Sequence, residues 1–163
     1  MGKFDWGTHV INDSEVILAG YNKFEDLESC EKYCTKIAKS NYENFIISNW
    51  FTPKEIKQHI QNIYAFCRYG DDLGDDAPFP PEERILLLDE WMKDLERAYD
   101  SKNELWSGKP KHPIIIALAN TAKKYKIPLT PFKRLIEAFK LDQQKTRYSN
   151  YNELKHYCIH SAA

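Results

Sequence analysis

Apolar side chains recur along most of the chain at spacings of three and four residues, which is the period of an amphipathic α-helix. Alternating runs of Val, Ile and Thr, the pattern of β-strands, are weak throughout. With their start and stop signals, the apolar residues predict six helices: 24–40, 53–76, 81–99 and 113–125, one that opens at 130, and one from about 149 to the last residue. Six helices joined by short loops predict an all-α fold, a helical bundle.

The second predicted helix has the clearest start. Thr52 is its expected N-cap, Pro53 its first residue, and Glu55 completes a capping box. Its apolar stripe consists of Ile56, Ile60, Ile63, Tyr64 and Cys67. This stripe predicts the face that packs inward.

The same stripe leads into a group of carboxylates. At 100° per residue it continues to Asp71 and then, at its edge, to Asp75, with Arg68 beside it. Asp72 and Asp76 project further toward the polar side. The sequence therefore predicts that Asp71 and Asp75 point inward, where core residues are expected.

Two inward carboxylates one helical turn apart repel each other. At about 6 Å and an effective dielectric of about 20, the repulsion between Asp71 and Asp75 is about 3 kcal/mol. A proton or a divalent cation could offset it. Mg²⁺ suits such a pair together with phosphate oxygens, and Arg68 can fork onto a phosphate. The alternative is a solvated acidic helix end, but carboxylates at a helix C-terminus oppose the macrodipole, and such conflicts often mark functional sites.

Composition narrows the class of protein. The chain has 163 residues, 42% hydrophobic and 29% charged, with a formal net charge of -1, which fits one globular domain and argues against a nucleic-acid-binding protein. The apolar run 114–119 is too short to cross a bilayer, and residues 1–6 lack a signal-peptide pattern. We therefore expect a cytoplasmic protein.

The four cysteines do not form a CxxC pair. Cys30 and Cys34 stand one helical turn apart, whereas Cys67 and Cys158 are isolated. They are either zinc ligands or small buried thiols. Because no cluster of partner ligands accompanies them, the buried thiols are favoured.

Two segments resemble the squalene/phytoene synthase family. Residues 64–76, YAFCRYGDDLGDD, are similar to its first aspartate-rich motif. Residues 139–148, FKLDQQKTRY, and then 153–158, ELKHYC, are similar to its D-x-x-x-x-R-Y segment and Tyr-Cys helix. The resemblance runs from about Cys34 to the end. It implies part of a terpenoid-synthase-like fold, the N-terminal half of an all-α prenyl-synthase domain over 23–163. The pattern of residues 1–22 separately predicts an irregular N-terminal arm.

Three further segments resemble the hydroxysqualene synthases of hopanoid biosynthesis: 41–45, NYENF; 112–113, HP; and 158–162, CIHSA. This implies an enzyme that converts presqualene diphosphate to hydroxysqualene with magnesium-assisted loss of diphosphate. Two alternatives stay open. One is a head-to-head prenyl transferase that makes presqualene diphosphate, squalene or phytoene, since these enzymes share the motif. The other is a non-catalytic helical assembly factor of the same family.

The resemblance also implies roles for single residues. Asp71 and Asp75 would hold Mg²⁺ against the diphosphate and so serve catalysis, and Asp72 and Asp76 would assist. The substrate-binding residues would be Tyr64, Arg68, Arg147 and Tyr148.

Tyr157 would face the reacting carbocation, which its ring can stabilise. Asp142 is a weaker candidate. Bland alternatives remain for three positions: a core aromatic for Tyr157, a surface salt bridge for Arg147 and a charge at the edge of the apolar stripe for Asp142.

The expected partner is a prenyl diphosphate substrate, with peripheral membrane contact because that substrate is apolar. The sequence indicates no nucleic acid and no obligate protein partner. The family's second aspartate-rich motif does not occur in these residues, and residues 160–163 lack a helix stop signal. We therefore expect a truncated domain that is inactive by itself and exposes apolar surface.

Overall fold

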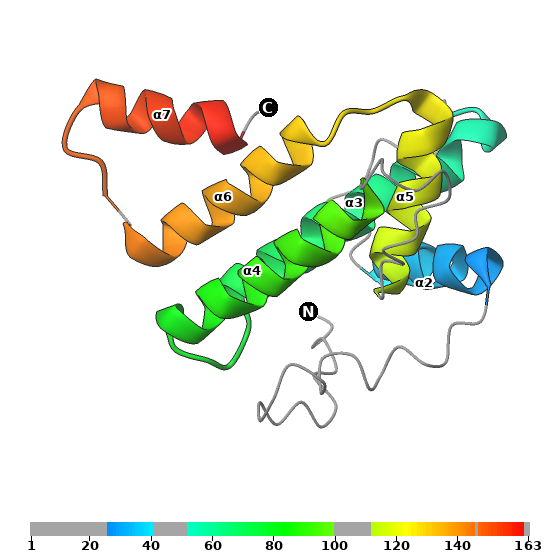
Figure 1. Cartoon of the computed structure of the whole chain (residues 1–163), viewed down its shortest axis with the longest axis horizontal. Coiled ribbons are helices and arrows are strands. Elements are labelled where there is room, and N and C mark those ends of the chain that lie inside the picture. The colour runs from blue at the N-terminus through cyan, green and yellow to red at the C-terminus, as the bar shows by residue number, and fades with distance from the viewer. Residues whose placement is uncertain (1–25, 41–51, 100–111, 146, 162–163) are drawn as a thin grey trace. The chain divides into compact units, whose positions relative to one another are not determined.

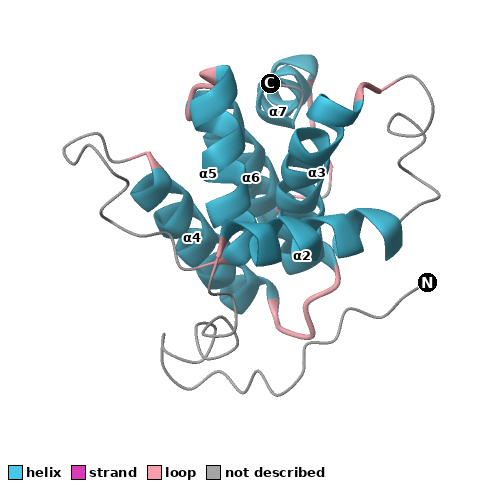
Figure 2. Ribbon diagram, turned by 90° about the vertical axis from the view of Figure 1, so that its right-hand side faces the viewer, coloured by secondary structure: helices cyan, strands magenta, loops and turns pink. Residues whose placement is uncertain are grey.

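The computed structural model describes residues 26–40, 52–99, 112–145 and 147–161. They form six helices: α2 (Leu27–Ser40), α3 (Lys54–Asp75), α4 (Pro81–Ala98), α5 (Pro113–Tyr125), α6 (Thr130–Gln144) and α7 (Tyr151–Ser161) (Figure 1). Figure 2 shows helices and loops and no strand in the described parts of the chain. The predicted all-α fold is confirmed, and the predicted helices match these six to within a few residues. The expected arm 1–22 and the motif at 41–45 lie outside the described residues.

Proline residues set several helix starts. α4 opens with Pro81 after the extended Pro80, and α5 opens with Pro113. Pro is suited to these positions because its fixed φ matches the helix and its missing N–H would have no partner there. α3 begins one residue later than predicted, and the Pro53 carbonyl accepts the N–H groups of Ile56 and Lys57.

The chain divides into two compact units. The first comprises residues 1–66 and 109–125, and its helices are α2, the first part of α3, and α5. α2 packs against α5, and the packing buries Cys30, Cys34, Ile114 and Leu118. The buried thiols favoured by the sequence are thus present at Cys30 and Cys34, where burial raises the thiol pKa to about 11 and about 12, respectively.

Polar side chains are also buried in the first unit. Nδ1 of His59 lies 3.0 Å from Oγ1 of Thr121, and Asn62 donates to the same hydroxyl and to the carbonyl of Ala117. Thr121 also donates to Ala117. Because these groups form hydrogen bonds with one another, they can be buried without water as a partner.

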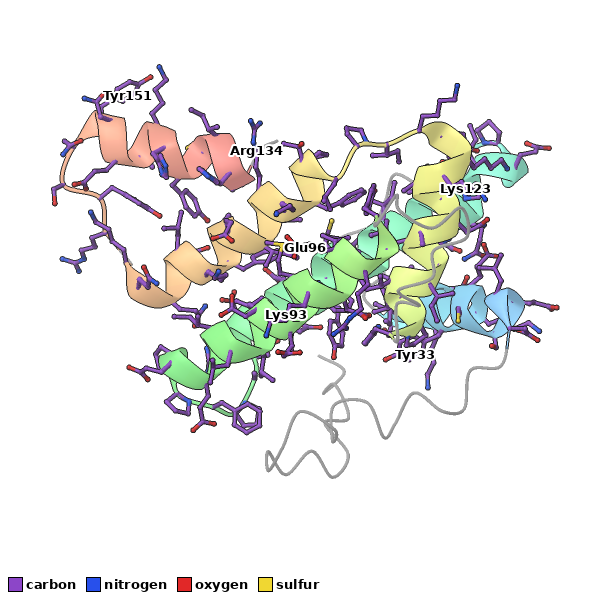
Figure 3. All side chains as sticks on the ribbon, in the orientation of Figure 1. Tyr33, Lys93, Glu96, Lys123, Arg134 and Tyr151 are labelled. Atoms are coloured by element: carbon purple, nitrogen blue, oxygen red, sulfur yellow. The ribbon has the colours of Figure 1, made fainter. Side chains whose placement is uncertain are left out.

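The second unit comprises residues 67–108 and 126–163, with the rest of α3, α4, α6 and α7. α6 packs against both α4 and α7, and Figure 1 shows α7 turning back along α6. Its core contains Leu88, Leu95 and Ile136, with Trp91 against the ring of Tyr69. No residue of α7 is fully buried, and Tyr151 at its start, labelled in Figure 3, is 75% exposed.

The predicted apolar stripe of α3 is not its buried face. Ile56 is exposed, and the other four members, Ile60, Ile63, Tyr64 and Cys67, are only half-buried. The buried positions of this helix are instead His59, Gln61, Asn62, Ala65, Phe66, Tyr69, Gly70, Asp72, Leu73 and Gly74. The prediction was wrong because it counted only apolar side chains, whereas this helix buries polar residues that find hydrogen-bond partners and glycines that permit close packing.

Candidate active site

The last two turns of α3 carry four carboxylates with different surroundings. Asp72 is buried, with 5% exposure, and Asp71 is half-buried. Asp75 and Asp76 are exposed. The inward position predicted for Asp75 is wrong, because this residue lies in the exposed last turn of the helix, as the alternative of a solvated acidic helix end expected. The outward position predicted for Asp76 matches its exposure, but that for Asp72 is wrong, because the face of Tyr69 and Leu73 packs inward and carries Asp72 with it.

Arg68 binds three of the four carboxylates. Its Nη1 donates to Oδ2 of Asp71 at 3.1 Å, and its Nη2 pairs with Asp72 and, at 3.3 Å, with Oδ2 of Asp76. Its buried Nε has no hydrogen-bond partner among the described residues. One guanidinium thus faces three carboxylates, so the cluster of Arg68, Asp71, Asp72 and Asp76 keeps a net negative charge.

Burial and the neighbouring negative charges make the carboxyl groups of Asp72 and Asp71 weaker acids. Burial raises the pKa of Asp72 to about 6, although Arg68 opposes the rise. The pKa of Asp71 is also raised, first by burial and then by the negative charges of Asp75, Asp76 and Asp142, again against Arg68. A bound cation would relieve this cost.

Arg84 places a positive charge at the C-terminal end of α3, where the carboxylates oppose the helix dipole. From α4 it donates through Nη1 to the carbonyls of Gly74 and Asp75 at 2.6 and 3.1 Å, and through Nε to the carbonyl of Phe79 at 2.8 Å. A cation on the last carbonyls of a helix is favourable. Sequence reasoning missed Arg84. The only signal for its role was that a basic residue follows soon after the end of α3, whose own last turn contains no basic residue.

Two glycines bring α6 close to the acidic end of α3. A Cβ atom at Gly70 would meet Cε2 of Phe139 at 2.7 Å, and one at Gly74 would meet Nε2 of Gln143 at 3.2 Å. This approach puts Asp142 of α6 within electrostatic range of Asp71 and Asp75. The spacing of the glycines, one helical turn, was the signal for this contact, and sequence reasoning did not use it.

Asp142 links the acidic end of α3 to α7. Tyr157 donates from its hydroxyl to Oδ2 of Asp142 at 2.9 Å, and its ring lies 5.3 Å from that of Tyr148. The pKa of Asp142 is raised by burial and by Asp75, while the Tyr157 hydroxyl opposes the rise. The structure thus brings Asp142, Tyr148 and Tyr157 together.

The remaining predicted site residues, and the hydroxyl of Tyr148, differ in their burial. Arg147 is exposed, and Tyr64 is half-buried one turn before Arg68, in the part of α3 that belongs to the first unit. The buried hydroxyl oxygen of Tyr148 has no hydrogen-bond partner among the described residues.

The carboxylates fit a magnesium ion that a substrate also ligates. Within residues 26–40, 52–99, 112–145 and 147–161, no group of three His, Cys, Asp or Glu side chains is arranged to hold a metal alone. Mg²⁺ does not need such a cage, because it binds through one or two carboxylates, substrate phosphates and water. Asp71 and Asp75 would supply the carboxylates, and the partly exposed guanidinium of Arg68 would suit a phosphate oxygen.

Comparison with known proteins identifies the family. Residues 38–163 match the sequence profile described as squalene/phytoene synthase. The chain belongs to the squalene/phytoene synthase family. Within that family it is 34% identical over 138 residues to the chloroplastic phytoene synthase of Cucumis melo, which covers 85% of this chain and 30% of that protein. It is 30% identical to the 15-cis-phytoene synthase of Synechococcus elongatus, over 85% of this chain and 41% of that protein.

Solved structures agree with this assignment. The crystal structure of the squalene synthase HpnC from Alicyclobacillus acidocaldarius superimposes with a TM-score of 0.70 at 35% identity, over 83% of this chain and 48% of that one. The fold is therefore part of that of a squalene/phytoene synthase, and the chain spans between 30% and 48% of the length of these relatives. None of the helices in the described part of the chain is long and apolar enough to cross a membrane.

Proposed function

We propose that this protein acts on a prenyl diphosphate, converting presqualene diphosphate to hydroxysqualene with magnesium-assisted loss of diphosphate. The observation that carries the proposal is the carboxylate pair Asp71 and Asp75, which faces the further carboxylate of Asp142 electrostatically and is incompletely neutralised by Arg68. The resemblance at 112–113 and 158–162 supports the choice of substrate.

Bound Mg²⁺ would supply positive charge where the leaving diphosphate becomes negative. Asp71 and Asp75 would hold it, and the exposed Asp76 would assist. The burial of Asp72 and its pairing with Arg68 favour a supporting role, in which Asp72 holds the guanidinium for a phosphate oxygen.

The remaining residues act on the organic part of the substrate. Tyr157 would stabilise the cyclopropylcarbinyl cation left after diphosphate departs, through its ring and its hydroxyl oxygen. Rearrangement of this cation and capture of water, which loses a proton to the solvent, would then give the alcohol, and no nicotinamide is needed. Tyr64, Arg147 and Tyr148 would contact the substrate, whose apolar chains also favour loose contact with a membrane surface.

A second candidate is head-to-head condensation, which the similarity to phytoene synthases favours. The aspartate motif serves both reactions, so only the product separates them. Non-catalytic assembly is the remaining alternative, and the presence of Asp71, Asp72, Asp75 and Arg68 speaks against it.

Product analysis separates the candidates. The full-length gene product that contains these residues is incubated with Mg²⁺ and presqualene, farnesyl or geranylgeranyl diphosphate, and the lipids are identified by mass spectrometry. We expect hydroxysqualene from presqualene diphosphate. Presqualene diphosphate, squalene or phytoene as the product would replace the proposal with the condensation reaction, and the absence of any product would favour the assembly factor.

A further inference from the structure

The hydrogen bond between α6 and α7 in the second unit has a fixed direction. Oη of Tyr157 lies 2.9 Å from Oδ2 of Asp142. An ionised carboxylate can only accept, so the phenol donates its proton to Asp142. The lone pairs of the phenol oxygen then point away from Asp142 and remain available to another group.

The surroundings hold this arrangement in place. The ring of Tyr157 packs at 5.3 Å and 36° against that of Tyr148, and the ammonium of Lys145 lies 5.8 Å from the centre of the Tyr148 ring. Lys145 in turn pairs with Glu153 of α7 at 2.5 Å. The hydrogen bond, the ring contact and the ion pair together fix the orientation of the Tyr157 side chain.

The charges nearby keep the phenol neutral. Burial, the hydrogen bond to Asp142 and the negative charge of Asp142 raise the pKa of Tyr157 to about 12. Asp75 adds to the effect. Tyr157 therefore acts near neutral pH as an oriented dipole and not as a phenolate.

We propose that Asp142 is a positioning residue that acts through Tyr157: it holds the hydroxyl proton, so that the phenol oxygen and ring present their negative sides to the carbocation. This inference rests on the proposed function, because it assigns a role in the same reaction. The competing role for Asp142 is that of a further magnesium ligand, since its carboxylate also interacts with those of Asp71 and Asp75.

A double-mutant cycle separates the two roles. Asp142→Asn, Tyr157→Phe and the double variant are made in the full-length protein, and diphosphate release is measured at varied Mg²⁺. A hydrogen bond to a charged group corresponds to a factor of about ten to a hundred in rate, so each single variant should lower kcat by about that factor. The double variant should be no slower than the slower single variant, and the Mg²⁺ requirement should not change.

Glu137→Gln is the matched control. Glu137 lies on the same helix, and its replacement also converts a carboxylate to an amide, but its partner Lys140 keeps a second ion pair with Asp89. Its kcat should equal that of the wild type. If Asp142→Asn slows the Tyr157→Phe variant by a further tenfold, or raises the Mg²⁺ requirement, Asp142 acts on the cation and the proposal is wrong.

A second readout does not depend on turnover. With ¹³Cζ-labelled tyrosine, the NMR signal absent from Tyr157→Phe reports the ionisation of Tyr157. Near pH 10, the usual pKa of a phenol, it should remain un-ionised in the wild type and in Glu137→Gln but ionise substantially in Asp142→Asn. An unchanged titration in Asp142→Asn would overturn the pairing. A shifted titration without turnover of any prenyl diphosphate would instead overturn the proposed function and leave the pairing intact.

Discussion

The ring of Phe139 lies so close to Gly70 that a Cβ atom added there would stand 2.7 Å from Cε2 of the ring. This contact seats α6 on the last turns of α3, and with it Asp142 near the carboxylates of Asp71 and Asp75. The arrangement of the acidic cluster thus depends on Gly70, because a larger residue there would push the ring of Phe139 away.

Gly70→Ala should therefore lower the free energy of unfolding by about 1–3 kcal/mol, the usual cost of overpacking, even though Ala favours helix. Gly74→Ala is the control, because its nearest neighbour is the flexible end of Gln143, at 3.2 Å. Urea denaturation followed by circular dichroism measures both. A Gly70→Ala variant as stable as Gly74→Ala would mean that the close contact is absent.

The start of α5 should make the protein sensitive to acid. Nδ1 of the buried His112 accepts the N–H of Ile114 at 3.1 Å, and burial lowers its pKa well below 6.5. The imidazole of His112 takes up a proton near pH 6.5 in the unfolded state but not in the folded state. The contribution of His112 to the free energy of unfolding is therefore complete above about pH 6.5. It is lost as the pH falls below about 6.5, by up to about 1.4 kcal/mol per pH unit.

Denaturation of His112→Asn at several pH values tests this, because Asn can cap the helix but does not titrate. The advantage of the wild type over this variant should shrink as the pH falls from 7 to 5. A difference that stays constant over that range would exclude His112 as the source. His59, whose pKa is also lowered by burial and by Lys124, is present in both proteins and cancels in the comparison.

The prediction from sequence succeeded where local signals decide the structure. The helix starts at Pro81, Pro113 and Thr130 follow from proline chemistry and were placed correctly. It failed for Asp72, because a projection by hydrophobicity cannot show that Gly70 and Gly74 let another helix approach.

The candidate site was predictable only in part. The acidic motif is contiguous in sequence, so its position on α3 could be predicted. The hydrogen bond from Tyr157 to Asp142 joins two helices, and its formation depends on the turn between α6 and α7, which no spacing rule specifies. The capping of α3 by Arg84 is missed for the same reason.

Arg68→Gln should expose the repulsion within the acidic cluster. Without the guanidinium, the buried Asp72 and its neighbour Asp71 lose their ion pairs, and we expect a loss of about 1–3 kcal/mol in the free energy of unfolding. Mg²⁺ should recover part of this loss. Urea denaturation with EDTA or Mg²⁺ tests it, with Arg97→Gln, which breaks a similar pair with Asp94, as the control. An equal response of both variants to Mg²⁺ would contradict the account.

Thiol labelling should distinguish Cys158 from the other cysteines. Cys158 is exposed, whereas burial raises the pKa of Cys67 to about 11 and those of Cys30 and Cys34 similarly. Because the thiolate is the reactive form, the native protein should react rapidly with a disulfide reagent at one thiol, and Cys158→Ser should abolish that phase. Two or more rapid thiols in the native protein would show that α2 or α3 is less well packed than described.

The most direct test of the central claim is magnesium-dependent diphosphate release by the full-length protein, compared between the wild type and Asp71→Asn/Asp75→Asn. If this pair holds the cation against the leaving group, the variant should release diphosphate at least a hundredfold more slowly, as expected for lost electrostatic stabilisation of about 3 kcal/mol or more. Release at the wild-type rate, or undiminished biological function of the variant, would contradict the account and favour a non-catalytic helical protein.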